Sequence, residues 1–148
     1  MNKSLKSAAV LALAIALIGA QGGTMARADC MAEAQTQLAM NECAGQELRA
    51  ADAELNRIYK KLRETYAGDP VFLEKLKLAQ RAWIALRDGE LEAKFPSPNK
   101  SDYGSIFPLC ASQYLSGLTR KRIADLRVWL DGVQEGDACA GSVRISGE

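Results

Sequence analysis

The stretch LRAADAELNRIYKKLRETY, residues 48–66, decides the fold of this 148-residue chain. Its apolar residues recur at steps of three and four, the spacing that places side chains on one stripe of an α-helix. Thr36 is a suitable N-cap and Gly68 a suitable C-terminal stop, so a long helix is predicted over about residues 36–67. The apolar stripe consists of Leu48, Ala51, Leu55, Ile58, Leu62 and Tyr66.

A second helix is predicted after a very short link. Asp69-Pro70 combines an N-cap residue with a proline, whose missing N–H costs nothing in a first turn. Because the link is so short, the first two helices should be antiparallel neighbours. The helical spacing of apolar residues continues until Gly89 through Phe72, Leu76, Ala79, Trp83 and Leu86.

The remaining chain predicts a loop, a third helix and a tail. Residues 95–108, FPSPNKSDYGSIFP, contain three prolines and no period, which indicates a loop. A third helix is predicted from about Pro108 or Leu109 to Leu130, on the spacing of Leu115, Leu118, Arg122, Leu126 and Trp129. No stretch alternates convincingly as a strand. The predicted fold class is therefore all-α, a small disulfide-stapled bundle of three main helices whose first two form an antiparallel hairpin.

The first 28 residues have the features of a secretory signal peptide. Two lysines precede an apolar run over residues 8–18, and Ala26-Arg27-Ala28 resembles a cleavage site, so cleavage after Ala28 is predicted. The run is too short to span a bilayer, which takes about 20 residues. Asp29 precedes Cys30 where lipid attachment needs a small neutral residue, so a soluble periplasmic or secreted product is favoured.

Removal of this segment takes away three basic residues and no acid. It leaves 16 basic against 18 acidic groups, a net charge of −2. No basic face dominates, so nucleic acid is not an expected partner. The remainder suits one small helical domain over residues 29–131, followed by a tail over residues 132–148 that Cys139 would tie down.

The cysteine content predicts disulfides and argues against a metal site. All four cysteines follow the predicted cleavage site, and export leads to an oxidising compartment where thiols pair. Four cysteines allow three connectivities, and their spacing does not choose among them. The chain has no histidine and no CxxC motif, so neither a zinc site nor a cofactor is expected. The cysteines are Cys30, Cys43, Cys110 and Cys139.

Polar residues on the two predicted helices are spaced to meet across the helix pair. On the first helix they fall on one stripe at i, i+4 and i+7, and Arg81 or Arg87 of the second helix can reach Asp52. Loss of one partner costs roughly 3–5 kcal/mol where such a pair is buried, so we interpret these residues as structural. The predicted network comprises Asp52, Asn56, Tyr59, Arg81, Arg87 and Asp88.

The composition also argues against an enzyme. Without histidine, Ser-His-Asp and Cys-His arrangements are excluded, and oxidised cysteines cannot act as nucleophiles. Paired carboxylates, which can cleave glycosides, remain open among the 18 acids, but no pair stands out. No catalytic residue is therefore assigned, and hydrolysis of cell-wall glycans is the weakest of the functions considered.

Several segments, in their order, resemble the LprI-type lysozyme inhibitor family, a helical domain of exported bacterial proteins. The chain departs from the family at Leu91, where the family usually has a cysteine, and its YGSI segment is one glycine short of the family's pattern. The matching pieces are Cys30, TQLAMNECA (residues 36–44), ADAELNRIY (51–59), QRAWIALRD (80–88), YGSI (103–106), Cys110 and LTRKRIADL (118–126).

The resemblance implies a disulfide pairing. Leu91 replaces the usual partner of Cys110, and Cys139 is the thiol left over, so Cys30–Cys43 and Cys110–Cys139 are the expected pairs. The first pair would contribute roughly 3 kcal/mol on a chain-entropy estimate. The second would staple the tail to the third helix.

The resemblance also implies a binding protein that blocks lysozyme-type muramidases. Such an inhibitor needs a rigid scaffold and a projecting segment that fills the sugar-binding cleft. The loop of residues 95–108 is the candidate, because prolines lower its ordering cost and Lys100, Tyr103 and Ser105 offer hydrogen bonds; an ordinary connecting loop fits equally well. The alternative function is a non-catalytic envelope accessory protein that binds another exported protein or peptidoglycan.

Overall fold

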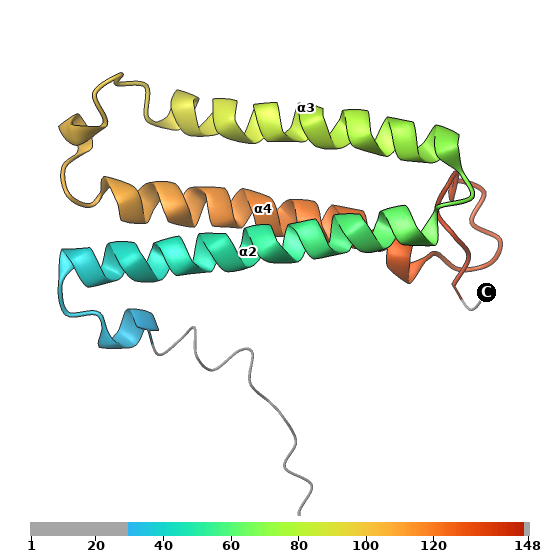
Figure 1. Ribbon diagram of the computed structural model, residues 1–148, viewed down its shortest axis with the longest axis horizontal. Helices are drawn as coiled ribbons and strands as arrows, with labels where there is room; N and C mark the ends of the chain where they lie inside the picture. Colours follow the sequence, from blue (N-terminus) through green and yellow to red (C-terminus); the bar gives the residue numbers. More distant parts are fainter. Residues whose placement is uncertain (1–29, 147–148) are drawn as a thin grey trace, which may run out of the picture.

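The computed structural model describes residues 30–146 as a bundle of three long helices (Figure 1). A helical turn over residues 30–33 comes first, and a short 3-10 helix lies between the last two long helices. The described residues contain no β-strand, which confirms the all-α prediction. The predicted signal peptide lies outside them. The elements are α2 (Gln37–Thr65), α3 (Pro70–Lys94), η1 (Lys100–Tyr103) and α4 (Phe107–Asp131).

The predicted capping residues begin the first two long helices. The Thr36 side chain accepts a hydrogen bond from the backbone N–H of Ala39 at 3.1 Å, and Asp69 accepts one from Phe72 at 2.9 Å. Each cap satisfies a backbone donor that has no partner within its helix. After the short link, α3 folds back antiparallel to α2 (Figure 1), as predicted.

Helix α3 runs past Gly89, its predicted end, and stops at Lys94. The prediction was wrong because one glycine costs a helix interior only about 1 kcal/mol, which the rest of a long helix offsets. The effective stop is Phe95-Pro96, because a residue that precedes proline disfavours the helical conformation.

Helices α2 and α4 run in the same direction and are the two most closely packed helices (Figure 1). The buried residues in their N-terminal halves are small, which lets the two backbones approach: helix separation depends on the side chains at the contact. These small residues are Cys43, Ala44 and Ala51 on α2, and Ser116 and Thr119 on α4. Larger residues fill the other half, namely Leu55, Ile58, Leu62, Ile123 and Leu126.

Helix α3 is the peripheral member of the bundle. Among its residues only Leu76 is buried, at 6% exposure. It reaches the other helices mainly through large side chains, including Trp83 and Phe72. The Phe72 ring lies 4.3 Å from the Tyr66 ring and 6.3 Å from the Trp129 ring, centroid to centroid. Aromatic contacts therefore hold the N-terminal end of α3 against α2 and α4.

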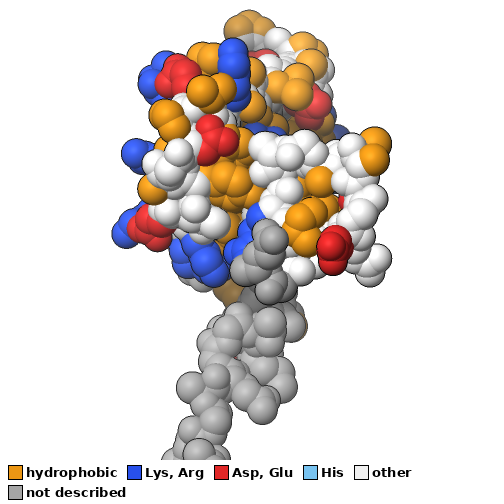
Figure 2. All heavy atoms as spheres, turned by 90° about the vertical axis from the view of Figure 1, so that its right-hand side faces the viewer, with side chains coloured by type: hydrophobic (Ala, Val, Ile, Leu, Met, Phe, Trp, Pro, Cys, Tyr) orange, Lys and Arg blue, Asp and Glu red, His pale blue; other side chains and the backbone are white. Residues whose placement is uncertain are grey.

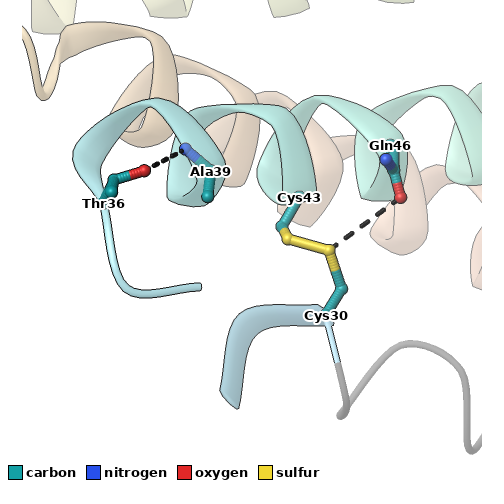
Figure 3. Close-up of a disulfide and its surroundings, with 5 residues drawn as sticks. All are labelled: Cys30, Thr36, Ala39, Cys43 and Gln46. Carbon is teal, nitrogen blue, oxygen red and sulfur yellow. Dashed lines mark hydrogen bonds between the residues drawn. A yellow bond between two sulfur atoms is a disulfide. The ribbon is translucent and has the colours of Figure 1, made fainter. Parts of the chain in front are cut away.

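A disulfide joins Cys30 to Cys43, as expected from the resemblance (Figure 3). It ties the helical turn over residues 30–33 to the first part of α2, close to the Thr36 cap. The other expected pair, Cys110–Cys139, is wrong, because both thiols are free. Cys110 lies in the first turn of α4 and Cys139 beyond its last turn, so about 20 helical residues, roughly 30 Å, separate the two positions. A disulfide requires Cα atoms within about 7 Å.

The tail is tied down by hydrogen bonds and not by Cys139. The Tyr66 hydroxyl donates to the Trp129 carbonyl at 3.0 Å and accepts from the backbone N–H of Arg144 at 3.2 Å. The Trp129 indole N–H donates to the Ser142 hydroxyl at 3.1 Å. Figure 2 faces this end of the bundle, where acidic, basic and hydrophobic side chains are interspersed. The tail thus covers the ends of α2 and α4.

Gly132 makes the turn from α4 into the tail. Its φ is +79°, in the left-handed region that favours glycine. A Cβ at this position would lie 2.9 Å from the Arg144 carbonyl oxygen and 2.9 Å from the Ser146 nitrogen. Glycine therefore permits both the backbone conformation and the close approach of the tail.

Gly132→Ala is expected to detach the tail, with a loss of about 1–3 kcal/mol in the free energy of unfolding. Denaturant unfolding and amide hydrogen exchange over residues 142–146 measure both effects. Gly136→Ala is the matched control, because Gly136 has φ +89° but a Cβ there would meet no atom within 4 Å. Equal loss of amide protection in the two variants would contradict the role assigned to close approach.

Candidate functional site

A shallow groove lies between α2 and α3, beside the bundle core. It has a volume of about 200 Å³. It is built from the segments ADAELNRIY and QRAWIALRD, two of those that carry the family resemblance. Its lining residues are Asp52, Leu55, Asn56, Gln80, Trp83, Ile84 and Arg87.

Arg87 is the centre of the polar contacts in this groove. Its Nη1 lies 3.3 Å from Asp52 Oδ1, and its Nε donates to Asp88 Oδ1 at 3.0 Å. The guanidinium carbon lies 5.3 Å from the centre of the Trp83 ring, a cation–π geometry. The Thr119 hydroxyl donates to Asp52 at 3.3 Å. Asp52 thus connects α2 to both α3 and α4, and Arg87 is the arginine that reaches it.

Other members of the predicted network are not bonded into it. Asn56 is exposed and lines the groove, and its side chain makes no hydrogen bond to another described residue. Tyr59 packs against the hydrophobic core. Arg81 is exposed and has no ion pair within residues 30–146. The structure therefore brings together Asp52, Arg87 and Asp88, and leaves the other three outside the bonded set.

The predicted network missed the pair formed by Arg122 and Gln80. Arg122 Nε donates to Gln80 Oε1 at 3.1 Å and connects α4 to α3. Burial lowers the pKa of Arg122, and the nearby Asp125 carboxylate acts in the opposite direction. The sequence feature that could have predicted this pair is the position of Arg122 in the apolar stripe of the third helix, where a charged side chain needs a polar partner.

The loop between α3 and α4 is held by its own side chains. Lys100 Nζ donates to the Phe95 carbonyl at 2.6 Å and to Glu92 at 2.7 Å. The Tyr103 hydroxyl accepts a hydrogen bond from the backbone N–H of Ser97 at 2.8 Å. The rings of Phe95, Tyr103 and Phe107 pack with centroids 5.2–5.6 Å apart. Lys100 and Tyr103 therefore order the loop from within.

The loop is also fastened to the start of α2. The Asn41 amide donates to the carbonyl of Ser105 at 2.9 Å, while the Ser105 side chain remains exposed. At the other end of the loop, the Asn99 side chain caps η1. The loop is thus a preordered element at the end of the bundle opposite the tail (Figure 1). Its exposed residues are Pro96, Pro98, Asn99, Ser101, Asp102, Gly104, Ser105 and Ile106.

Comparison with known proteins decides the family. The family model described as "Lysozyme inhibitor LprI" matches residues 21–126. The chain belongs to the lysozyme inhibitor LprI family. An uncharacterized protein of Rhizobium meliloti (strain 1021) is 41% identical over 118 residues, which cover 72% of this chain and 81% of that protein. No solved structure matches the chain.

The LprI match covers both surfaces described above. It includes α2, α3, the loop and most of α4, and it ends before the tail. Across residues 30–146, no helix has the length and apolar character needed to cross a membrane. In the same part of the chain, no three acidic or cysteine side chains are grouped so that they could hold a metal ion.

The solvent exposure of Asp52 and Arg87 determines how much their ion pair contributes to the free energy of unfolding. The Asp52 side chain is 42% exposed and that of Arg87 is 19% exposed. Solvent screens such a pair, so the figure for buried pairs does not apply, and the ion pair alone contributes about 1 kcal/mol or less. Arg87 also covers part of the Trp83 ring, which adds packing to the charge contact.

Arg87→Ala is expected to lower the free energy of unfolding by about 1–2 kcal/mol, because it removes both the ion pair and the contact with Trp83. Lys61→Ala is the control, since Lys61 is exposed on α2 and has no ion pair among the described residues; it should change stability by less than about 0.5 kcal/mol. Urea unfolding of both variants measures the difference. A loss of about 4 kcal/mol for Arg87→Ala would show that the pair is buried.

Proposed function

We propose that this chain is exported and inhibits a lysozyme-type muramidase by placing the loop of residues 95–108 in the substrate cleft of that enzyme. Membership of the lysozyme inhibitor LprI family supports an inhibitor of this class. The observation that carries the proposal is the set of hydrogen bonds that hold the loop in place, from Lys100 and Tyr103 within it and from Asn41 on α2.

A preordered loop suits an inhibitor because ordering a flexible segment on binding lowers affinity. The loop is already ordered in the free chain by the Lys100 contacts, the Tyr103 hydroxyl and the three packed rings, so little further ordering is needed on binding. Protein inhibitors that bind through such segments change shape little between free and bound states. The loop can therefore enter a cleft without first having to fold.

The chemistry of a muramidase cleft also fits the loop. Glycosidases of this type use two carboxylic side chains that flank the scissile bond. Lys100 has three donors and uses two, one to the Phe95 carbonyl and one to Glu92 of α3, so one ammonium N–H remains for a carboxylate. The Tyr103 hydroxyl accepts one hydrogen bond and keeps its own proton to donate. The exposed Ser105 hydroxyl is a third donor, and these three residues are the proposed contacts.

Export is the second part of the proposal. The signal-peptide features of residues 1–28 support it, and so does the Cys30–Cys43 disulfide, since disulfides persist in oxidising compartments. The mature chain would begin at Asp29 and act in the periplasm or outside the cell. A non-catalytic role agrees with the positions of Asp52 and Arg87, whose charged groups bind one another and Thr119.

One observation favours the alternative, an accessory protein that binds peptidoglycan. The groove between α2 and α3 presents polar groups that are not used within residues 30–146. They are the Asn56 amide, the Gln80 amide nitrogen and the Trp83 indole N–H, and each can hydrogen-bond a sugar hydroxyl. Sedimentation with insoluble peptidoglycan tests this alternative, which requires binding that Asn56→Ala weakens.

The purified chain from Asp29 is expected to inhibit at least one of the goose-, chicken- and invertebrate-type lysozymes in a peptidoglycan-clearing assay. Ser105→Glu should raise the inhibition constant at least about tenfold, a loss of about 1.4 kcal/mol, because a carboxylate would meet the carboxylates of the cleft. Absence of inhibition of all three types at micromolar excess would contradict the proposal.

Ala53→Glu provides the matched control for this experiment. Ala53 is exposed on α2, away from the loop, and its substitution introduces the same charge. The control is expected to leave the inhibition constant unchanged. Equal weakening by Ala53→Glu and Ser105→Glu would place the inhibitory surface outside the loop, even if the chain proved to be an inhibitor.

A further inference from the structure

Helix α3 has an apolar face that the bundle does not cover. Val71, Leu78 and Leu86 are 70%, 49% and 59% exposed. They stand seven and eight residues apart, about two helical turns each, so they lie on one face of the helix that is about 80° wide. Ala82 and Ala85, both exposed, lie between them. Within the described chain, no element lies on the outer side of α3 (Figure 1).

This face is distinct from the side of α3 that meets the core. Leu76, Trp83 and Arg87 point to the bundle, and their spacing of seven and four residues defines the inner line of the helix. Val71, Leu78 and Leu86 are offset from that line by about a quarter to almost half of a turn. A helix with apolar residues on both faces has more apolar surface than one bundle contact can bury.

Charged residues along one edge of this face are arranged by sign except for Glu74, which lies on the same edge and pairs with Lys77 at 3.4 Å. Lys77 and Arg81 lie in the N-terminal half of α3, and Asp88 and Glu92 lie in the C-terminal half, all exposed. The steps between them are four, seven and four residues, so all four stand on the same edge. In an antiparallel pair of helices, an edge meets the same edge of the partner, where the basic half would face the acidic half.

The charged residues define one antiparallel register for such a pair of helices. Arg81 and Asp88 are centred on the point between Ile84 and Ala85, and so are Lys77 and Glu92. A two-fold axis at that point therefore aligns four ion pairs, two of each kind. With this axis, Leu78 and Leu86 of each copy lie within the paired length of the two helices, on either side of Ala85, and Val71 lies beyond it.

The acidic residues of this edge can accept a second partner. Asp88 binds Arg87 and Glu92 binds Lys100 through one carboxylate oxygen each, with side chains 58% and 63% exposed. The other oxygen of each carboxylate is unused within residues 30–146. Arg81 has no ion pair in that part of the chain, so its guanidinium group is available to an acidic side chain of a second copy.

We propose that the outer face of α3 binds a second copy of this chain, with the two α3 helices antiparallel and the two-fold axis close to Ala85. The interface is isologous, since both copies use the same residues. Helix α3 has 25 residues, about 37 Å in length, and two of its large exposed apolar side chains, Leu78 and Leu86, lie within the paired length. That is less than the roughly 800 Å² per partner of a standard interface, so the dimer is weak and dissociates more readily at high salt.

This dimer does not rest on the proposed inhibitory function. The loop of residues 95–108 follows the C-terminal end of α3 and takes no part in the apolar face. An antiparallel pair places the two loops at opposite ends of the dimer. Inhibition by the monomer and dimer formation can therefore succeed or fail separately.

Sedimentation equilibrium of the chain from Asp29, over about 1–200 μM at low and high salt, tests the proposal. Cys110→Ser and Cys139→Ser are included in every sample so that the free thiols cannot cross-link copies. We expect a monomer–dimer equilibrium whose dissociation constant rises with salt. A monomer at all concentrations and both salt levels would overturn the proposal.

Substitutions on exposed leucines locate the interface. Leu78→Glu is expected to raise the dimer dissociation constant at least about tenfold. Leu38→Glu is the matched control, because Leu38 is 68% exposed on α2, and it should leave the constant unchanged. Circular dichroism confirms that both variants are folded. An equal effect of the two substitutions would overturn the assignment to α3.

Cross-linking tests the antiparallel register. In the Cys110→Ser, Cys139→Ser background, Ala85→Cys is expected to form an intermolecular disulfide under an added copper–phenanthroline oxidant, because residue 85 lies next to its own copy at the axis. Val71→Cys should not, since the two copies of residue 71 are at opposite ends of the interface. Efficient cross-linking through residue 71 and not through residue 85 would overturn the register.

Discussion

The close approach of α2 and α4 is the constraint on which the rest of the structure depends. The two helices run in the same direction, and the buried residues in their N-terminal halves are small, with Ala44 and Thr119 fully buried. A contact between small residues tolerates neither larger side chains nor a shift of one helix along the other, because a tightly packed interface has no space for an extra methylene group. The position of α4 along α2 is therefore well defined, and further contacts follow from it.

The packing of α2 against α4 positions both candidate surfaces, the loop of residues 95–108 and the groove between α2 and α3. At one end, the fixed register of α2 and α4 brings Asn41 to the carbonyl of Ser105, which fastens the loop. In the middle, it brings Thr119 to Asp52, which in turn receives Arg87 from α3. Helix α3 adds few buried residues of its own, so it completes the groove and leaves an apolar face outward. The polar contacts join the three helices, and the loop and the outer face of α3 are the surfaces that we propose to bind partners.

The sequence predicted the elements better than their arrangement. The starts of the first two helices could be predicted from Thr36, Asp69 and Pro70, because caps and first-turn prolines act locally. The parallel pairing of α2 with α4 was not, since small buried residues such as Ser116 carry no strong periodic signal. Gly89 was misread as a helix end because propensity is a weak prior in a long helix. The Cys110–Cys139 pair failed for a different reason: counting leftover thiols contains no information about the length of the helix that separates them.

The side chain of Ser116 offers the most direct test of the close α2–α4 contact. Ser116 is 2% exposed, and its hydroxyl has no hydrogen-bond partner among the described residues. Urea unfolding should show that Ser116→Ala is neutral or stabilising, because it removes an unsatisfied polar group. Ser116→Leu should lower the free energy of unfolding by about 1–3 kcal/mol, because the added volume separates the helices. If Ser116→Leu were as stable as the unsubstituted chain, the helices would not be in close contact at this position, and the account of the loop and groove would lose its basis.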